Sequence, residues 1–505
     1  MPNLSLIRTV QPTFEATELA PTRSDLPDDA ALAVPVLAAG ADGGAVELGP
    51  GAAELEEDLA VDLVAVLEGL GARGSAGELL RVPVPDREVY AVGVGAGTPD
   101  DLRRAGAALG RSVRAERLAS SVSAVGADDA LTAFVAGLVL GSFSFTLRTG
   151  ELPTRVAGVT VCCTPGADDT LVRARSIAVA SWRARWLASV PSNIKDPAWL
   201  ADQVVALAEE VGLETRVWDE KRLAADGFGG ILAVGRASSS PPRLVRLDYQ
   251  PEGRVRRRQP RIVLVGKGIT FDTGGLSIKP GEAMVNMKRD MTGAAVVTGV
   301  MSALAAVGCP VPVTGLLACA ENAIGDDAMR PGDVLRHYGG TTTEVTNTDA
   351  EGRLVMADAL AYADAELDPA VLVDVATLTG AMKVAVGLHL GGFFATDDGL
   401  AETVRSASRE SGERVWRMPL AEEYDSLLDS QVADLENAPG PAGAITAALF
   451  LRHFTGGRPW LHLDIASVGD ALEDRHEWTK GPTGFGVRLL LHWLGSADPL
   501  EGVER

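Results

Sequence analysis

The chain has 505 residues, of which 46% are hydrophobic, 23% are charged and only 5% are aromatic. This composition is typical of a globular protein with an ample core and excludes a disordered or collagen-like chain, and the length favours two domains over one. The formal charge of −22 disfavours binding to nucleic acid or anionic lipid, because a field of this sign repels phosphate groups.

The first part of the chain alternates short apolar runs with helix-like stretches. This alternation predicts a smaller N-terminal α/β domain with parallel strands, because crossover helices join strands of that kind. The expected strands are AALAVPVLAAG (30–40) and VYAVGVGAG (89–97), and the expected helices are DLAVDLVAVLEGLG (58–71) and DDLRRAGAALGRSVRAERLASSV (100–122).

A stretch with two prolines, SVPSNIKDPAWL (189–200), follows a predicted helix that contains SWRARWLA. Because such a stretch interrupts regular structure, we place the domain boundary just before it. The N-terminal domain is expected to cover residues 1–185, and a larger C-terminal domain is expected to cover residues 186–505.

The second part of the chain repeats the alternation more strongly. Its apolar runs are short and continuous, which is typical of strands buried on both faces in a mostly parallel sheet covered by helices. Ligands collect beyond the carboxyl ends of such strands, so polar residues there are candidates for function. The expected strands are RIVLVGKG (261–268), VPVTGLLACA (311–320), TTEVTNTD (342–349), VLVDVATL (371–378), GGFFATDD (391–398) and PWLHLDIA (459–466).

One uncharged segment, residues 291–320, is long enough to cross a membrane. Gly308, Pro310 and Pro312 interrupt it, so we interpret it as a buried helix followed by a buried strand. The N-terminal residues lack the pattern of a secretory signal, and a cytoplasmic protein without a membrane partner is expected. Four cysteines without CxxC spacing are interpreted as small buried side chains in a reducing compartment: Cys162, Cys163, Cys309 and Cys319.

The strongest basic patch stands against the acidic background of the chain. We interpret it as a solvated loop that leads into a strand, so nucleic acid is disfavoured as a partner. The patch comprises Arg254, Arg256, Arg257, Arg258 and Arg261.

Lysine is scarce, with seven lysines against 39 arginines. Three of the seven, Lys267, Lys279 and Lys288, fall within 22 residues of one another. Where arginine supplies positive charge in general, a retained lysine suggests a task that arginine cannot perform, such as losing its proton or acting as a compact charge.

Carboxylates accompany these lysines near the ends of predicted strands. Four carboxylates in one dry site would carry a negative charge that needs compensation by positive charge. Two divalent cations bridged by carboxylates would supply it. A set rich in oxygen, with one possible amine and no histidine, suits Mg²⁺, Mn²⁺ or Zn²⁺ and excludes the HExxH type of zinc site. The six histidines are interpreted as structural or surface residues. The acidic residues are Asp272 and Asp290 near the lysines, and Asp349 and Glu351, followed by Arg353, in NTDAEGRL (347–354).

Each of these residues also has a structural alternative. Asp290 could cap the uncharged helix, and Asp349 with Glu351 could stabilise the N-terminus of a predicted helix over 353–365 through its dipole. Lys267 and Lys279 could be surface charges. Spacing alone does not show that the two acidic segments meet in space.

These segments resemble the leucyl aminopeptidase family, the dinuclear-metal exopeptidases also called cytosol aminopeptidases. The resemblance covers roughly residues 190–495, whereas the N-terminal domain is similar to the family only in its general α/β character. It implies a metal-dependent hydrolase that removes N-terminal residues from peptides, with bulky apolar residues as the expected preference. The matching segments are NTDAEGRL and VGKGITFDTGG with Lys279 and Asp290 after it, then ACAENAIGDDAMRPGDV, DVATLTGA, DSQVADLENAPGPAGAITAALFL, HLDIA and TGFGVRLL.

The resemblance implies a role for each matching residue. Asp272 and Glu351 would bridge two ions, Zn²⁺ or Mn²⁺ with Mg²⁺ or Co²⁺ as alternatives. Lys279 would stay protonated and polarise the scissile carbonyl, and Arg353 would hold a bicarbonate that acts as general base toward the bridging water. Lys267 would be a neutral amine ligand, because two adjacent cations would lower its pKa. The implied metal ligands are Lys267, Asp272, Asp290, Asp349 and Glu351, and the implied substrate-binding residues are Leu378, Gly380 and Met287.

The resemblance further implies a homohexamer in which the C-terminal domains pack around the centre. Ser467 follows DIA where the family usually has glycine, and Pro482 replaces a small residue before TGFGV, so the side-chain preference stays open. Two alternative functions are considered. DNA binding, which some members show, is disfavoured by the charge of −22, and an inactive regulatory relative is disfavoured because every implied ligand, Lys279 and Arg353 are present.

Overall fold

The computed structural model describes residues 11–17, 30–38, 46–126, 128–163, 166–252 and 259–504. The chain forms two compact units, one of Met1–Trp182 with Ala471–Gly481 and one of Arg183–Asp470 with Pro482–Arg505. The division falls inside helix α5 (Asp168–Ser189), as does the predicted boundary between residues 185 and 186, which stays a prediction. The segment 471–481, predicted in the second domain, groups with the first unit.

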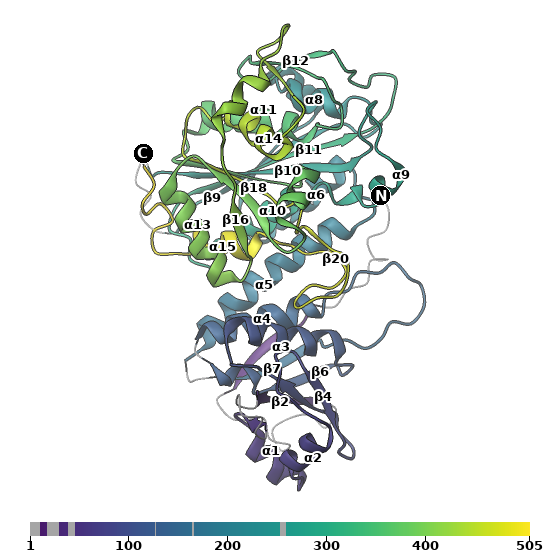
Figure 1. Cartoon of the computed structure of the whole chain (residues 1–505), viewed down its shortest axis with the longest axis vertical. Helices are drawn as coiled ribbons and strands as arrows, with labels where there is room; N and C mark the ends of the chain where they lie inside the picture. The colour runs from purple at the N-terminus through teal and green to yellow at the C-terminus, as the bar shows by residue number, and fades with distance from the viewer. Residues whose placement is uncertain are drawn as a thin grey trace. The chain divides into compact units, whose positions relative to one another are not determined.

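The first unit is built on a seven-stranded sheet (Figure 1). The strand order is β1-β7-β6-β2-β5-β4, with β3 beside β2, and all pairs are parallel except those of β3 and β4. The strands are β1 (Thr13–Thr17), β2 (Ala31–Leu37), β3 (Glu47–Leu48), β4 (Leu79–Val82), β5 (Val89–Gly93), β6 (Arg117–Ser120) and β7 (Gly158–Cys162). The helices are α1 (Ala52–Leu59), α2 (Leu63–Gly69), α3 (Pro99–Ser112), α4 (Asp128–Gly141) and the first part of α5.

Two helix predictions in this unit are wrong in extent. The stretch 58–71 is interrupted at Ala60, which has a left-handed φ of 52°, and α2 then begins after Asp62, whose carboxylate accepts a hydrogen bond from the amide of Ala65 at 2.9 Å. The stretch 100–122 is helical only to Ser112, after which β6 pairs with β2 and β7. Pairing with two neighbouring strands outweighs the local helical pattern there.

The second unit is built on an eight-stranded sheet in the order β16-β15-β18-β14-β10-β11-β9-β8. The four central strands β18, β14, β10 and β11 are parallel, and antiparallel pairs occur toward both edges. The predicted mostly parallel sheet therefore describes the centre of the sheet. The strands are β8 (Glu214–Trp218), β9 (Arg243–Tyr249), β10 (Ile262–Asp272), β11 (Val313–Asn322), β14 (Val371–Ala376), β15 (Gly391–Ala395), β16 (Val415–Arg417) and β18 (Trp460–Asp464).

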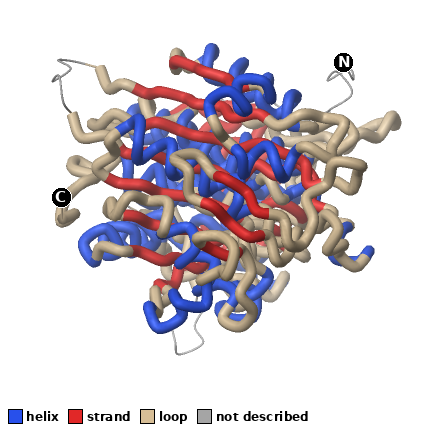
Figure 2. The backbone as a smooth tube through the Cα atoms, turned by 90° about the horizontal axis from the view of Figure 1, so that it is seen from above, coloured by secondary structure: helices blue, strands red, loops and turns tan. Residues whose placement is uncertain are grey.

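Helices lie on both sides of this sheet, as Figure 2 shows. The 3₁₀ turns are Val122–Val125 in the first unit and Met287–Arg289 and Glu422–Leu428 in the second. The α-helices of the second unit are α6 (Pro197–Glu210), α7 (Glu220–Asp226), α8 (Gly229–Gly235), α9 (Gly281–Met284), α10 (Thr292–Met301), α11 (Gly352–Leu367), α12 (Gly380–Val386), α13 (Asp398–Ser411), α14 (Gly443–Arg452) and α15 (Val487–Leu494). The uncharged segment thus forms α10 and β11, and no described helix is long and apolar enough to cross a membrane.

The predicted strand over 342–349 is wrong in extent. Only β13 (Thr342–Glu344) is extended, and it belongs to a separate small sheet with β12 (Val334–Arg336) and β17 (Leu435–Glu436). Residues 345–350 form a loop that leads into α11. Two further short strands are β19 (Asp470–Ala471) and β20 (Gly481–Pro482).

The two faces of β10 meet different helices. Val263 and Val265 belong to the core that includes α8, α11 and α14. Gly266 faces α10, where a Cβ would lie 2.7 Å from the Cα of Ala294. Because successive side chains of a strand alternate between faces, Lys267 points to the α11 side. The alternation of β10 therefore directs its lysine toward the loop that carries Asp349 and Glu351.

Two predictions on single residues can be placed here. Three of the four cysteines are buried as predicted, and the prediction is wrong for Cys163, which is partly exposed. Of the basic patch, Arg254, Arg256, Arg257 and Arg258 lie outside the described residues. Arg261 stands just before β10 and forms an ion pair with Asp248 at 2.8 Å.

Candidate metal centre and active site

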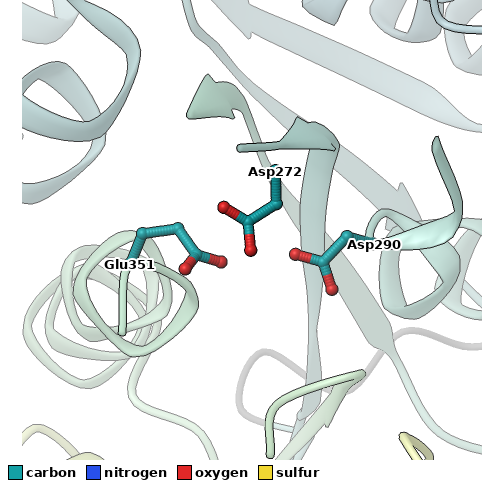
Figure 3. Close-up of side chains that lie close together, drawn as sticks. All are labelled: Asp272, Asp290 and Glu351. Atoms are coloured by element: carbon teal, nitrogen blue, oxygen red, sulfur yellow. The ribbon is translucent and has the colours of Figure 1, made fainter. Parts of the chain in front are cut away.

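Three acidic side chains meet at the carboxyl end of the central strands. Asp272 ends β10 after a register irregularity that begins at Ile269, Asp290 follows the 3₁₀ turn Met287–Arg289, and Glu351 immediately precedes α11. Each offers an oxygen within 4.8 Å of the others, and all three are buried. Figure 3 shows the three carboxylates pointing toward a common space. The two segments that carry them are thus brought together by the fold.

Asp272 is oriented by the end of the neighbouring parallel strand. Its Oδ1 accepts hydrogen bonds at 2.8 Å from the amide of Gly274 and from Nδ2 of Asn322, the last residue of β11. Gly274 and Gly275 both have positive φ, at 84° and 63°, and a Cβ on Gly275 would lie 2.9 Å from Oγ1 of Thr348. Two glycines are therefore needed for this turn to pack against the 345–350 loop.

Two lysines compensate the carboxylates. The ammonium of Lys267 lies 2.7 Å from Oδ2 of Asp290 and 2.9 Å from Oε1 of Glu351. A Cβ on Gly352 would lie 2.6 Å from Nζ of Lys267, so glycine after Glu351 leaves room for the ammonium. Lys279 forms ion pairs with Asp272, at 2.8 Å, and with Asp349.

The electrostatics show that this compensation is incomplete. Burial, together with the neighbouring carboxylates, raises the pKa of Asp272, Asp290 and Asp349 despite the two lysines. Burial alone would lower the pKa of Lys267 and of Lys279, but the adjacent carboxylates outweigh it and raise both. The site is thus short of positive charge. Buried, converging carboxylates in need of positive charge fit divalent cations, and the donor set is the oxygen-rich type that such ions accept.

The loop 345–350 is held by a residue far along the chain, Asn437. Its buried amide accepts hydrogen bonds from the amides of Thr346 and Asn347 at 2.8 and 3.2 Å and donates to the carbonyls of Asn347 and Ala350 at 2.8 and 3.3 Å. Its own carbonyl accepts from Nη1 of Arg353. Burial lowers the pKa of Arg353 to about 10, against the opposing effect of Glu351.

A turn after β14 closes the other side of the site. Oγ1 of Thr377 donates to Oδ1 of Asp290 at 2.8 Å, and the carbonyl of Thr377 accepts from Nζ of Lys267 at 3.3 Å. Leu378 is half-buried, Gly380 is exposed at the start of α12, and Met287 is half-buried in the 3₁₀ turn before Asp290. The structure thus places Leu378 and Met287 on chain segments that contact the ligand candidates.

The structure contradicts two of the structural alternatives, a cap by Asp290 and surface positions for the two lysines, whereas a dipole effect of Asp349 and Glu351 on α11 stays a prediction. The N-cap of α10 is Met291 without a side-chain hydrogen bond, so Asp290 does not cap that helix. Glu351 stands at the N-cap position of α11 but makes no capping hydrogen bond. Lys267 is buried, and the side chain of Lys279 is 15% exposed. None of these four side chains is a solvated surface charge.

Sequence reasoning missed three polar residues of the site, namely Asn322, Thr377 and Asn437. All three lie in segments that carried the resemblance, and Asn322 and Thr377 follow buried runs at strand ends. Neutral side chains add nothing to the charge pattern of the sequence. Position in the chain was therefore the one sign by which these residues could have been found.

Comparisons with known proteins agree with this geometry. The profile of the cytosol aminopeptidase family, catalytic domain, matches residues 182–491, and that of the N-terminal domain of the same family matches residues 38–148. The chain belongs to the cytosol aminopeptidase family. It is therefore a metal-dependent aminopeptidase, a hydrolase that acts on peptides, and its two-domain α/β architecture is that of the family.

Relatives and solved structures extend the agreement over most of the chain. A probable cytosol aminopeptidase of Rhodococcus jostii is 41% identical over 475 residues, covering 90% of this chain and 92% of the relative. A mutant of tomato leucine aminopeptidase is similar with a TM-score of 0.84 and 31% identity, covering 96% of this chain and 97% of its own. The bottromycin maturation enzyme BotP in complex with Mn is similar with a TM-score of 0.81 and 35% identity, covering 93% and 99%.

Proposed function

We propose that the chain holds two divalent cations in this site and uses them to hydrolyse the first peptide bond of a peptide. The observation that carries the proposal is the buried trio Asp272, Asp290 and Glu351, whose oxygens converge within 4.8 Å. Asp272 and Glu351 would bridge the ions, and Lys267 and Asp349 would complete the ligand set, as the family resemblance implies. When bound, the ions would lower the pKa of an attacking water and stabilise negative charge on the scissile carbonyl oxygen.

Two cationic side chains would assist the reaction. The ammonium of Lys279 stays protonated beside Asp272 and Asp349, and its partial exposure allows it to donate a hydrogen bond to a substrate carbonyl. Arg353 is buried, and within the described residues its Nε has no hydrogen-bond partner. A donor of this kind supports the binding of a small anion, and bicarbonate is the proposed general base.

The turn after β14 is the proposed substrate-binding segment. The amide of Leu378 already donates to Asp464 at 3.1 Å, so its carbonyl oxygen is the group left to accept a hydrogen bond from a peptide. Gly380 offers exposed backbone at the start of α12, and Met287 offers an apolar side chain beside Asp290. A bulky apolar N-terminal residue is the proposed preference.

The remaining features of the proposal concern the metal, the assembly and the compartment. Zn²⁺ or Mn²⁺ is proposed, with Mg²⁺ or Co²⁺ as alternatives, and the manganese complex of BotP supports Mn²⁺. The family resemblance supports a homohexamer, which light scattering of the purified protein would test. The names of the relatives support a cytoplasmic location. Peptides are the proposed partners, and the charge of −22 disfavours nucleic acid.

Elemental analysis of the purified full chain, combined with a panel of aminoacyl-anilides, tests the proposal. Two ions per chain and turnover of anilides with apolar residues are expected, and chelation should abolish turnover until Zn²⁺ or Mn²⁺ is returned. Lys279→Ala should lower kcat about 10²–10³-fold with both ions retained. Lys221→Ala, which removes an exposed lysine on α7, is the matched control. Unchanged kcat in Lys279→Ala would contradict the role given to Lys279, and no turnover of any anilide by the ion-loaded protein would refute the proposed hydrolysis.

A further inference from the structure

Asp464 ends β18 beside the last residue of β14 and is fully buried. Its carboxylate accepts four hydrogen bonds. Oδ1 accepts from the amides of Leu378 and Ala466 at 3.1 and 3.0 Å, and Oδ2 accepts from the amide and Oγ1 of Thr379 at 3.2 and 2.9 Å. Three of the four donors belong to the turn that follows β14, so one side chain fixes the course of that turn.

The same turn contacts the proposed metal ligands on its other side. Thr377, immediately before Leu378, donates its hydroxyl to Asp290 and accepts at its carbonyl from Lys267. The backbone of residues 377–379 therefore connects Asp464, hydrogen-bonded at one end, with Asp290 and Lys267, hydrogen-bonded at the other. A shift of the turn would move the Leu378 carbonyl relative to Asp290.

A carboxylate is the side chain that this arrangement requires. Both of its oxygens accept two hydrogen bonds, whereas the amide of asparagine has one accepting oxygen and one donating nitrogen. Asp464→Asn would therefore leave one pair of donors, either Leu378 with Ala466 or the two donors of Thr379, facing an N–H group. The substitution keeps the shape of the side chain and removes half of its accepting capacity.

Two neighbouring side chains, His462 and Arg353, interact electrostatically with Asp464. His462 stands two residues earlier on β18, which places both side chains on one face, and its ring pairs with Asp374 at 2.5 Å. His462 lowers and burial raises the pKa of Asp464, with burial the larger effect. Burial lowers the pKa of Arg353, and Asp464 is one of the carboxylates that oppose this effect. A buried carboxylate that accepts four hydrogen bonds is suited to hold a segment in place.

We propose that Asp464 is a positioning residue for the substrate, which sets the Leu378 carbonyl at a fixed place relative to the metal ligands. This inference rests on the proposed function, in which Leu378 binds the peptide and Asp290 binds metal. Asp464 contacts neither the substrate nor the ions in this assignment. It acts through the backbone of residues 377–379.

The test compares Asp464→Asn with Asp358→Asn, which alters another fully buried carboxylate that accepts backbone hydrogen bonds away from this turn. Because small displacements of a binding group have large kinetic effects, kcat/KM of Asp464→Asn for an aminoacyl-anilide should fall about 30–100-fold, with KM raised at least about 10-fold. Both ions should be retained by elemental analysis. Asp358→Asn should leave KM and kcat of the folded enzyme unchanged.

Three results would overturn the inference. They are wild-type KM in Asp464→Asn, loss of an ion with wild-type KM at the loaded sites, and an equal rise of KM in Asp358→Asn. If Asp464→Asn does not fold, Thr379→Val removes one of the four donors, and KM of the folded enzyme should rise about 3–10-fold, with a small fall in the melting temperature. Wild-type KM in Thr379→Val would then overturn the inference. Wild-type enzyme is assayed first, so a wild type without peptidase activity refutes the proposed function instead.

Discussion

Helix α11 carries two buried acids with opposite surroundings, Glu351 at its N-terminus and Asp358 two turns later on the same face. Asp358 accepts hydrogen bonds from the amides of Ile231 and Tyr338, both at 2.9 Å, and shares a hydrogen bond with Nδ1 of His337 at 3.1 Å. Within the described residues, the carboxylate of Glu351 has an ion pair with Lys267 and no regular hydrogen bond. Hydrogen bonds within the described part of the protein satisfy the carboxylate of Asp358, but they do not satisfy that of Glu351.

This difference distinguishes an acid that holds the fold from one that is prepared for a ligand. Backbone amides satisfy the hydrogen-bonding capacity of the Asp358 carboxylate, so we expect Asp358 to contribute to the free energy of unfolding. Glu351 instead faces Asp272 and Asp290, and the mutual repulsion of the three carboxylates is only partly offset by Lys267 and Lys279. Substitutions at the two positions should therefore change different measurements, metal content at one and the free energy of unfolding at the other.

The largest effect is expected for Glu351→Gln. The neutral amide removes a proposed bridging charge, so bound metal should fall below two ions per chain and kcat/KM should fall more than about 10³-fold. The free energy of unfolding of the chelated protein should change by no more than about 1 kcal/mol, because relief of repulsion offsets the lost ion pair with Lys267. Elemental analysis and chemical denaturation measure the two quantities. Retention of both ions would remove Glu351 from the ligand set.

Asp358→Ala should give the opposite result. It leaves the amides of Ile231 and Tyr338 and the ring of His337 without their acceptor, which should cost about 3 kcal/mol of unfolding free energy. Metal content and the kcat of the folded fraction should stay at wild-type values. Denaturation of the chelated variant, with elemental analysis of the loaded one, checks both statements. If the variant lost metal while keeping its stability, the contrast between the two acids would be wrong.

Asn437→Ala should fall between these two cases. Asn437 contacts no proposed ligand, but its amide holds the loop that carries Asp349. The substitution should cost about 2 kcal/mol, because buried backbone groups of the loop lose their partners. It should also weaken metal binding, so that more Zn²⁺ is needed to restore half of the activity after chelation. A variant that loses stability with wild-type metal affinity would show that the loop keeps its shape without Asn437.

The sheet of the second unit was predictable because its central strands are buried on both faces and read as continuous apolar runs. The segments 261–268 and 371–378 formed strands for this reason. TTEVTNTD (342–349) has a similar pattern, but its second half bonds to the side chain of Asn437, about 90 residues later. The segment 100–122 failed similarly, because the pairing of β6 is set by strands distant in sequence. Local patterns do not contain such partners.

Most charged residues of the candidate site were predictable from the sequence, whereas its neutral polar residues were not. Scarce lysines and acids at strand ends identified the residues that the fold brings together, whereas Asn322, Thr377 and Asp464 were not singled out. Scarce lysines also mark a second buried position. Lys195, outside the cluster, is fully buried and donates to the carbonyls of Leu187, Ala188 and Lys288 at 2.9, 3.3 and 2.7 Å. A rare lysine thus also marks the end of helix α5, where its Nζ donates to backbone carbonyls and burial lowers its pKa.

The smallest effect is expected for Ser467→Ala, at the residue that follows the segment 464–466. The hydroxyl of Ser467 is buried and donates to the carbonyl of Leu390 at 2.6 Å, so it belongs with Asp358 among the saturated polar groups. Its loss should lower the unfolding free energy by about 1 kcal/mol and leave metal content and kcat unchanged. The contact also links the segment after β18 to the residue before β15. A change in this contact could therefore alter which N-terminal residue of a substrate is preferred. If the order of preference among aminoacyl-anilides changes in Ser467→Ala at constant kcat for the leucyl substrate, Ser467 shapes the side-chain pocket. An unchanged order restricts its role to the fold.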